Sequence, residues 1–393
     1  MKSNKKIVFL SIPSFNNKGD ELMINSLFLF LKVNYPNHII CVPFFIKVPE
    51  YYSGISKIPV TLKSKRNLKH SILRKSLKFL NLFLMLIPNK VKTTLKIFST
   101  SDVDLVFDTS GYYLGYHFKV EKINNLVKIY KDLKSKNSKA KLFFLPKSFG
   151  PLKMKKTIAF GEEILKYPDY VFARDRISYE EVKALLSNRN TQLKYCPDYT
   201  VNFNIDLTEN SQKRVVIVPN YRNVERSNLI TLNSYVDFLY KCYKYLMDLG
   251  LDTVFLIHTQ KDEQSIINEL IKLDSQIKFK EGLSFFEIKK FIGSSYMVIS
   301  SRYHGLINGL TQEIPVIGTS WSHKYQELFK EYNIEEFLLS KIQFDELVEK
   351  IDLLLDEEIR EKYIEKIRKR NVLVKEIVDD MWSSIKIEIH KTN

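Results

Sequence analysis

The stretch YMVISSRYHGLINGL (Tyr296–Leu310) decides the fold class, because its pattern changes within a few residues. YMVISS is a short apolar run that ends in serines, as a strand buried in a parallel sheet does. GLINGL then has helical character, and Pro315 opens the next apolar run. We therefore expect a buried strand, a loop over Ser301–Gly305 and a helix, which together form the repeating unit of an α/β protein.

The same alternation of apolar runs and helix-like segments continues over most of the chain. It predicts parallel sheets with helices on both faces. The pattern pauses near Pro197–Ile205, and we place a domain boundary near residues 205–213. The predicted domains are 1–207 and 208–393, with the C-terminal helices packing back. The expected strands are Lys5–Ile12, His38–Phe45, Asp104–Asp108, Lys141–Pro146, Tyr170–Arg174, Arg214–Asn220, Asp252–Thr259, Gln276–Gly282, Tyr296–Ser301 and Ile314–Ser320.

Length and composition are those of an ordinary soluble protein with a sizeable core. The chain has 393 residues, of which 45% are hydrophobic and 27% charged. The longest apolar candidate, Leu80–Ile87, is under half of the roughly 18–20 residues that span a bilayer. The three cysteines, Cys41, Cys196 and Cys242, are scattered and predict neither disulfides nor a zinc site. We expect a cytoplasmic protein with no metal and no cofactor.

The net charge of +16 favours anionic partners, namely phosphorylated substrates, an acidic membrane surface or nucleic acid. A coding bias toward lysine could also explain much of it. Residues 62–97 are basic and apolar together, with almost no acid. Either this segment lies on an acidic membrane at the inner face of the cell envelope, or it is a packed helical insertion with a solvated basic face.

The loop Ser301–Gly305 is the first candidate site. Ligands in open α/β sheets bind where strands end, and a helix N-terminus favours an anion. Arg302 adds a planar cation suited to carboxylate or phosphate, and His304 adds a group that transfers protons near neutral pH. Gly305 would let the backbone approach a ligand closely. The alternative is that His304 is a hydrogen-bonded structural histidine.

The ordered set of motifs resembles the polysaccharide pyruvyl transferase family. The Arg-Leu-His segment of that family, its G-x-P-x-I strand and its following lysine correspond to RYHG, EIPVIG (Glu313–Gly318) and Lys324. Two departures are notable: Lys147 replaces the usual glutamine, and the glycine cluster near residue 110 is thinned. Donor or acceptor choice could therefore differ. The other matching motifs are NNKGD (Asn16–Asp20), DTSGYYLG (Asp108–Gly115), LPKSFGP (Leu145–Pro151), ARDRIS (Ala173–Ser178) and CPDYT (Cys196–Thr200).

The resemblance implies two Rossmann-like domains facing a cleft, similar to the B-type glycosyltransferase fold. Residues 1–207 would hold the acceptor and residues 208–393 the donor. It also implies transfer of pyruvate from phosphoenolpyruvate to two hydroxyls of a sugar, which leaves a cyclic ketal. The partners would be phosphoenolpyruvate and a free or lipid-linked glycan of a surface-polysaccharide precursor, and no nucleic acid.

This reaction assigns roles to the candidate residues. Arg302 and Lys324 would bind the donor anion, and a protonated His304 would protonate its methylene carbon. A carboxylate must accept the sugar hydroxyl proton, and Asp108 is the first candidate. Asp20 is the second, although capping a helix is an alternative role for it.

Further residues carry weaker expectations. Asn17 and Arg174 could contact substrate, although Arg174 could instead pair with Asp175. Asp198 could serve a turn or an inter-domain hydrogen bond. The aromatic run Tyr112–Phe118 could stack on a sugar or pack in the core. Two more histidines are weaker proton-transfer candidates, His117 and His323.

Two other functions stay open on the sequence. A nucleotide-sugar glycosyltransferase would share the architecture and would bind a uridine or cytidine diphosphate sugar. A non-catalytic basic protein would bind membrane or nucleic acid, in a salt-dependent way that does not depend on Arg302 or His304. No nucleic-acid module is visible in the sequence.

Overall fold

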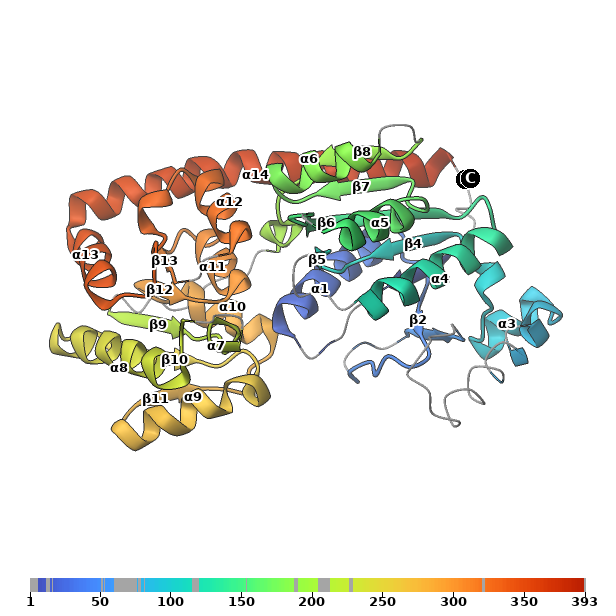
Figure 1. The fold of residues 1–393 in the computed structure, drawn as a ribbon. Coiled ribbons are helices and arrows are strands. Elements are labelled where there is room, and N and C mark those ends of the chain that lie inside the picture. Colours follow the sequence, from blue (N-terminus) through green and yellow to red (C-terminus); the bar gives the residue numbers. More distant parts are fainter. Residues whose placement is uncertain are drawn as a thin grey trace. The chain divides into compact units, whose positions relative to one another are not determined.

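The chain folds into two compact units, each built on a parallel sheet (Figure 1). The first unit comprises Met1–Phe15, Met23–Tyr199 and Val378–Asn393, and the second Asn16–Leu22 and Thr200–Ile377. The predicted α/β class is confirmed. The structure, a computed structural model, describes residues 6–11, 15, 17–50, 52, 54–59, 76, 79–80, 82–114, 120–152, 154–186, 190–203, 213–225, 229–319 and 322–391.

Within the described residues, the sheet of the first unit runs in the order β3-β2-β1-β4-β6-β7-β8, with β5 paired to β6. Every pairing is parallel, and the chain reverses its direction of travel across the sheet between β1 and β4. The carboxyl ends of β1 and β4 therefore form the crevice where doubly wound sheets bind ligands. The strands are β1 (Ile7–Ser11), β2 (Ile39–Pro43), β3 (Ser56–Ile58), β4 (Leu105–Asp108), β5 (Tyr112–Tyr113), β6 (Lys141–Phe149), β7 (Tyr170–Ala173) and β8 (Gln192–Tyr195).

Helices flank this sheet and bury its apolar faces. Strand β4 is buried along its whole length, as expected for a strand covered on both faces. Helix α6 is capped by Asp175, whose side chain accepts from the backbone N–H of Ser178 at 2.7 Å. The helices are α1 (Lys18–Asn34), which begins in the segment assigned to the second unit, α3 (Asn89–Leu95), α4 (Val120–Lys136), α5 (Lys155–Ile164) and α6 (Arg176–Leu185).

The second unit repeats the plan with fewer strands. Among its described residues, the sheet order is β11-β10-β9-β12-β13, again all parallel, and the reversal falls between β9 and β12. The strands are β9 (Arg214–Val218), β10 (Asp252–Leu256), β11 (Lys278–Lys280), β12 (Met297–Ser300) and β13 (Val316–Gly318). The helices are α7 (Arg222–Glu225), α8 (Leu232–Asp248), α9 (Gln260–Leu273), α10 (Phe285–Gly293), α11 (Tyr303–Leu310), α12 (His323–Tyr332), α13 (Phe344–Leu355) and α14 (Glu357–Lys391).

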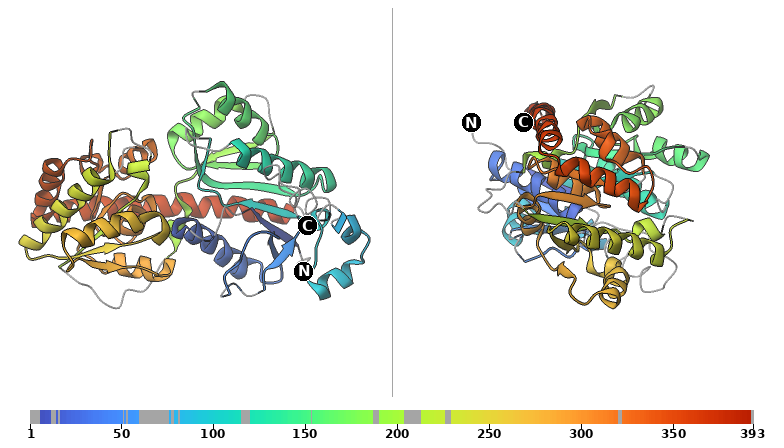
Figure 2. Two further views of the ribbon diagram at one scale, coloured as in Figure 1. Left: turned by 60° about the horizontal axis from the view of Figure 1, so that its bottom comes forward. Right: turned by 90° about the vertical axis from the view of Figure 1, so that its left-hand side faces the viewer.

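All ten expected strands are present. Nine are shorter than predicted, β6 is longer, and three further strands among the described residues were not predicted. Strands β3 and β5 have only three and two residues, too few to show a periodicity. Strand β8 has half-exposed and exposed side chains, so it lacks the apolar run that marks a central strand. Most of the predicted boundary at 205–213 lies outside the described residues. The end of α14 (red in Figure 2) is counted with the first unit, where Lys6 donates to the carbonyl of Ile389 at 3.1 Å.

Candidate functional site

The predicted site loop lies at the reversal point of the second sheet. Strand β12 ends at Ser300, Arg302 occupies the N-cap position of α11, and Asn220 follows the neighbouring strand β9. Open α/β sheets bind ligands at this crevice. The expected connection from a strand to a helix N-terminus is present, but it is shorter than the predicted Ser301–Gly305, because α11 already begins at Tyr303.

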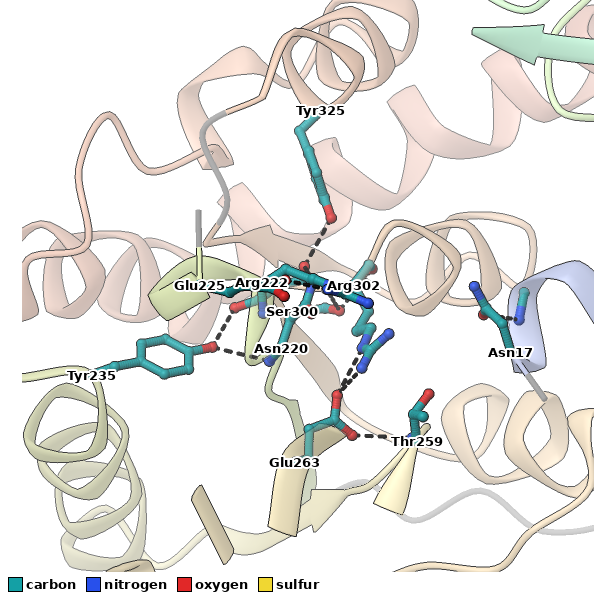
Figure 3. A network of polar contacts seen from close by, with 12 residues as sticks. Asn17, Asn220, Arg222, Glu225, Tyr235, Thr259, Glu263, Ser300, Arg302 and Tyr325 are labelled. Atoms are coloured by element: carbon teal, nitrogen blue, oxygen red, sulfur yellow. Dashed lines mark hydrogen bonds and ion pairs between the residues drawn. The ribbon is translucent and has the colours of Figure 1, made fainter. Parts of the chain in front are cut away.

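A hydrogen-bond network that includes Asn220, Tyr235 and Tyr325 fixes this loop (Figure 3). The carbonyl of Ser301 accepts from Asn220 Nδ2 at 3.0 Å and from the Tyr325 hydroxyl at 2.8 Å. Its hydroxyl lies 2.8 Å from that of Tyr235 and 2.6 Å from that of Thr319. Side chains from several elements therefore hold the backbone beside Arg302, as a preorganised site requires.

Arg302 has a buried acidic partner that the sequence did not reveal. Glu263, in the first turns of α9, is fully buried and accepts from Arg302 Nε at 2.8 Å and from Nη2. Its other oxygen accepts from the backbone N–H of Thr259 at 3.1 Å. Figure 3 shows Arg302 pointing toward this carboxylate. The guanidinium is thus held in one orientation, because two of its nitrogens share one oxygen.

His304 lies in the first turn of α11 and packs against a glycine. The segment Asn16–Leu22 belongs to the same unit, and a Cβ atom on Gly19 would lie 2.7 Å from both Cγ and Cε1 of His304. Asn17 is exposed, and its side chain accepts from the N–H of Gly19 at 3.0 Å. Only glycine leaves room for the imidazole at this position, which gives the NNKGD motif a steric reason.

His258 is a second histidine at this edge that the sequence analysis missed. It follows β10, is 6% exposed, and its Nε2 meets no hydrogen-bond partner within the described part of the chain. Burial, together with the positive charges of Arg302, His304 and Lys18, holds the pKa of His258 well below its usual 6.5. His258 is therefore neutral near pH 7 and can offer a hydrogen bond to a ligand.

Two more residues that we predicted to bind the ligand are Gly305, in α11, and Lys324, in α12. Gly305 is buried, and a Cβ there would collide with the Ser300 hydroxyl and lie 3.5 Å from Val218. The lack of a side chain at Gly305 lets α11 pack on the sheet, and the close approach of a ligand to its backbone stays a prediction. The Lys324 ammonium lies 5.5 Å from the Tyr303 ring centroid and 5.1 Å from that of Tyr325, which places it beside the loop.

Asp108 ends β4 at the corresponding edge of the first unit, but it is fully buried. One carboxylate oxygen accepts from the N–H of Ser110 at 2.8 Å and lies 2.7 Å from the Lys147 ammonium. The other accepts from the hydroxyls of Tyr113 and Tyr130. Burial and the Asp108 charge raise the pKa of both tyrosines well above 10, so both phenols stay protonated and donate. A sugar hydroxyl cannot reach this carboxylate as it stands.

Lys147, the departure from the family pattern, completes this cluster. It has no exposed surface, and its ammonium lies 4.3 Å from the Tyr113 ring centroid and 4.4 Å from that of Phe144. Burial lowers the pKa of Lys147 to about 8, and the Asp108 charge opposes that shift. Asp108 and Lys147 therefore form a buried ion pair, in which each charge stabilises the other.

Arg174 is also engaged inside the first unit. It is 4% exposed, donates to the Ser148 hydroxyl at 3.2 and 3.0 Å, and pairs with Asp198 at 3.2 Å. The alternative pairing of Arg174 with Asp175 is wrong, because Asp175 caps α6 and accepts from Ser148. Asp198 pairs with Arg174 of its own unit, and the inter-domain hydrogen bond stays a prediction.

Asp20 is half-buried in the first turn of α1. The helix begins at Lys18, so the expected capping role of Asp20 is wrong, and Asn17 precedes the helix instead. Tyr112 is half-buried and Tyr113 buried, whereas the rest of the aromatic run from Gly115, with His117, lies outside the described residues. Among the residues that the structure describes, no group of three or more His, Cys, Asp or Glu side chains could hold a metal ion.

The chain was compared with models of known protein families. A family model described as polysaccharide pyruvyl transferase matches residues 17–323, more than three quarters of the chain. The chain belongs to the polysaccharide pyruvyl transferase family. The match includes both sheet edges described above, with Asp108, Lys147, Arg302 and His304. A search of curated protein sequences gave no match.

Solved structures with a similar fold are sugar-nucleotide enzymes and a glycosyltransferase. A putative UDP-N-acetylglucosamine 2-epimerase from Listeria monocytogenes is 10% identical, with a TM-score of 0.60 over 99% of this chain and 98% of that chain. The S. aureus MnaA–UDP structure is 12% identical, with a TM-score of 0.57 over 92% and 90%. A glycosyltransferase from Rickettsia africae is 14% identical, with a TM-score of 0.56 over 99% and 100%. Because the sequence identities are this low, the similarity establishes the fold alone. That fold has two Rossmann-like parts, as in B-type glycosyltransferases.

Proposed function

We propose that this pyruvyl transferase moves pyruvate from phosphoenolpyruvate to a sugar of a surface-polysaccharide precursor, forming a cyclic ketal. The observation that carries the proposal is the gathering of Arg302, His304 and His258 at the reversal point of the second sheet. A donor with a phosphate and a carboxylate needs fixed positive charge and proton transfer in one place. Family membership supports the transferase class, and the donor and the ketal are our inference.

Arg302 would bind the donor through the edge of its guanidinium that Glu263 does not engage. Glu263 holds Nε and Nη2, so the proposed contact to the anion is Nη1. Lys324, beside Tyr303, would add a second positive charge, and the N-terminus of α11 a partial one. Bound in this way, the anion would lie beside His304.

His304 would act as the general acid. It donates a proton to the methylene carbon of the donor, and positive charge develops at the neighbouring carbon. A sugar hydroxyl attacks that carbon and loses its proton. The second hydroxyl then attacks as the carbon–oxygen bond to phosphate breaks, and inorganic phosphate leaves. One hydroxyl proton restores His304 and the other leaves with phosphate or solvent, so atoms and charge balance.

Asp20 is better placed than Asp108 to accept the sugar proton. Asp108 is enclosed by donors and Lys147, whereas Asp20 is partly exposed. Asp20 also follows Gly19, which packs on the His304 ring. We therefore propose Asp20 as the base, and we assign Asp108 to holding the loop after β4.

Calorimetric titration of phosphoenolpyruvate tests the donor site. The wild type should bind it, and Arg302→Ala should bind at least about tenfold more weakly, because a charge-assisted contact is lost. Arg368→Ala is the matched control: it also removes a guanidinium paired with carboxylates, but on the exposed surface of α14. Phosphate release from phosphoenolpyruvate with pyranosides bearing 4,6- or 3,4-diols then tests transfer.

Two outcomes would overturn the proposal. One is tight binding of a UDP-hexose with no binding of phosphoenolpyruvate, which would favour the glycosyltransferase alternative. The other is phosphate release that is unchanged in Arg302→Ala. Repeating the titration with each pyranoside present tests the case in which the acceptor must bind before phosphoenolpyruvate.

A further inference from the structure

An apolar surface is exposed at one edge of the first unit. Of the 25 large apolar side chains that are exposed among the described residues, nine fall within residues 79–97. Phe79 is 73% exposed and Leu86 80%. We define the apolar edge by these nine residues: Phe79, Leu80, Leu82, Phe83, Met85, Leu86, Val91, Leu95 and Ile97. Such a concentration marks an interaction site rather than scattered surface residues.

The apolar edge adjoins the end of the sheet. Ile97 pairs with Lys57 of β3, the terminal strand of the sheet, and the N–H of Phe44 bonds to Ile58 of that strand at 2.9 Å. Phe44 and the next residue, Phe45, are also exposed, and they directly follow β2, the strand that pairs with β3. In Figures 1 and 2 the cyan helices of this region lie at the periphery of the unit.

Positive charge accompanies the apolar edge. Among the described residues of the range 76–97 there are three lysines, Lys90, Lys92 and Lys96, and no aspartate or glutamate. Lys92 is buried and pairs with Asp102 at 2.7 Å, but Lys90 and Lys96 are exposed beside the apolar side chains. Apolar side chains flanked by lysines are complementary to a bilayer surface, because its acyl chains lie beneath anionic headgroups.

Among the described residues, no helix is long and apolar enough to cross a membrane. A second copy of this chain fits the apolar edge less well. A symmetric dimer would bring this surface against its own copy, because the same patch meets itself across a two-fold axis. Lys90 and Lys96 of one copy would then face the same lysines of the other, which disfavours the contact.

We propose that the apolar edge docks the protein onto an anionic membrane surface. Phe79, Leu82, Phe83 and Leu86 would insert at the headgroup boundary, and Lys90 and Lys96 would contact anionic headgroups. Docking needs neither donor nor acceptor, so the proposal does not depend on the pyruvyl transfer reaction. It would place the enzyme where lipid-carried acceptors are found.

Vesicle sedimentation of the full chain tests it. Vesicles of phosphatidylcholine with about 30% phosphatidylglycerol should bind the wild type at least about tenfold more tightly than pure phosphatidylcholine. Raising the salt from about 0.1 M to about 0.5 M should weaken the binding. The variant with Phe79, Leu82, Phe83 and Leu86 all changed to Ser should lose at least about tenfold in affinity.

The control variant changes four exposed apolar residues elsewhere, Leu229, Ile271, Leu353 and Leu373, to Ser. It should bind as the wild type does. If the test variant unfolds early, the singles Leu86→Ser and Phe79→Ser and the pair Lys90→Glu with Lys96→Glu replace it, each expected to weaken binding. No binding to anionic vesicles, or equal loss in test and control variants, would overturn the proposal. So would a dimer in light scattering that the apolar-edge substitutions dissociate.

Discussion

The two sheet edges of this protein use charge in opposite ways. At the edge of the first unit, Asp108 pairs with Lys147 and Arg174 with Asp198, all nearly or fully buried. At the edge of the second unit, Glu263 pairs with Arg302, whose side chain keeps 13% of its surface exposed, and His304 and Lys18 add positive charge that acts on His258. The first arrangement holds a loop in place, whereas the second retains positive charge that an anion can use. A charged residue at a strand end is therefore not in itself a sign of chemistry.

The largest expected effect is on catalysis at the second edge. His304→Gln should lower the rate of phosphate release about 10²- to 10⁴-fold, the usual contribution of a general acid. The free energy of unfolding should change by less than about 1 kcal/mol, because the side chain is only half-buried. Single-turnover kinetics with urea unfolding measures both. A variant of unchanged rate would remove His304 from the mechanism.

The opposite result is expected at the first edge. Asp108→Ala should lower the free energy of unfolding by about 3–5 kcal/mol, because it leaves the Lys147 ammonium buried without its partner. Urea unfolding followed by circular dichroism measures this. The double variant Asp108→Asn with Lys147→Gln removes both charges and should lose less than the two single changes combined. Normal stability of Asp108→Ala with loss of activity would instead restore Asp108 as the base.

The buried lysine should also give a pH dependence. Lys147 loses its proton near pH 8 in the folded protein, compared with 10.5 in the unfolded chain. Between these values the unfolded state binds more protons, so the free energy of unfolding should rise with pH, by up to about 3 kcal/mol. Below pH 8 this contribution should be constant. Urea unfolding of the wild type minus Lys147→Gln isolates it, and a difference that is flat from pH 7 to 10 would contradict the assignment.

The smallest expected effect concerns the glycine against His304. Gly19→Ala should displace the imidazole and lower the rate about 10- to 100-fold with little change in stability, because catalytic groups tolerate small shifts poorly. Gly305→Ala is the contrast: its Cβ meets Ser300 beneath α11, so stability should fall by about 1–3 kcal/mol. Thermal unfolding and phosphate release separate the two. Equal rates in Gly19→Ala and wild type would show that the ring can move freely.

The fold could be predicted from the sequence because strands buried on both faces are continuous apolar runs. The site could be predicted only where its residues follow such a run. Arg302 and His304 follow β12 directly, and the loop after that strand is short. Glu263 lies in a polar helical stretch, QKDEQS, where an acid is usually solvated, so its pairing with Arg302 depends on tertiary structure.

The role of Asp108 could not be predicted for a similar reason. Asp108 stands at the end of a strand, which is also where a catalytic carboxylate would be expected. Tyr113, Tyr130 and Lys147 enclose it, and they come from three other parts of the chain. His258 could not be predicted as a site residue, because it stands at the end of an apolar run that reads as one strand. The packing role of Gly305 could not be predicted either, because a glycine needed for helix packing and one needed for ligand access have the same local sequence.

The ion pair of Asp108 and Lys147 also constrains how the sequence can evolve. A change at one of the two positions strands the opposite charge in the interior, at a cost of several kcal/mol. A change from Lys147 to glutamine, the residue that the family resemblance leads us to expect, is therefore accessible only after, or together with, a change at Asp108 or its tyrosine partners. The two positions should be inherited as a unit, and a library that varies either one alone would consist mainly of unstable proteins.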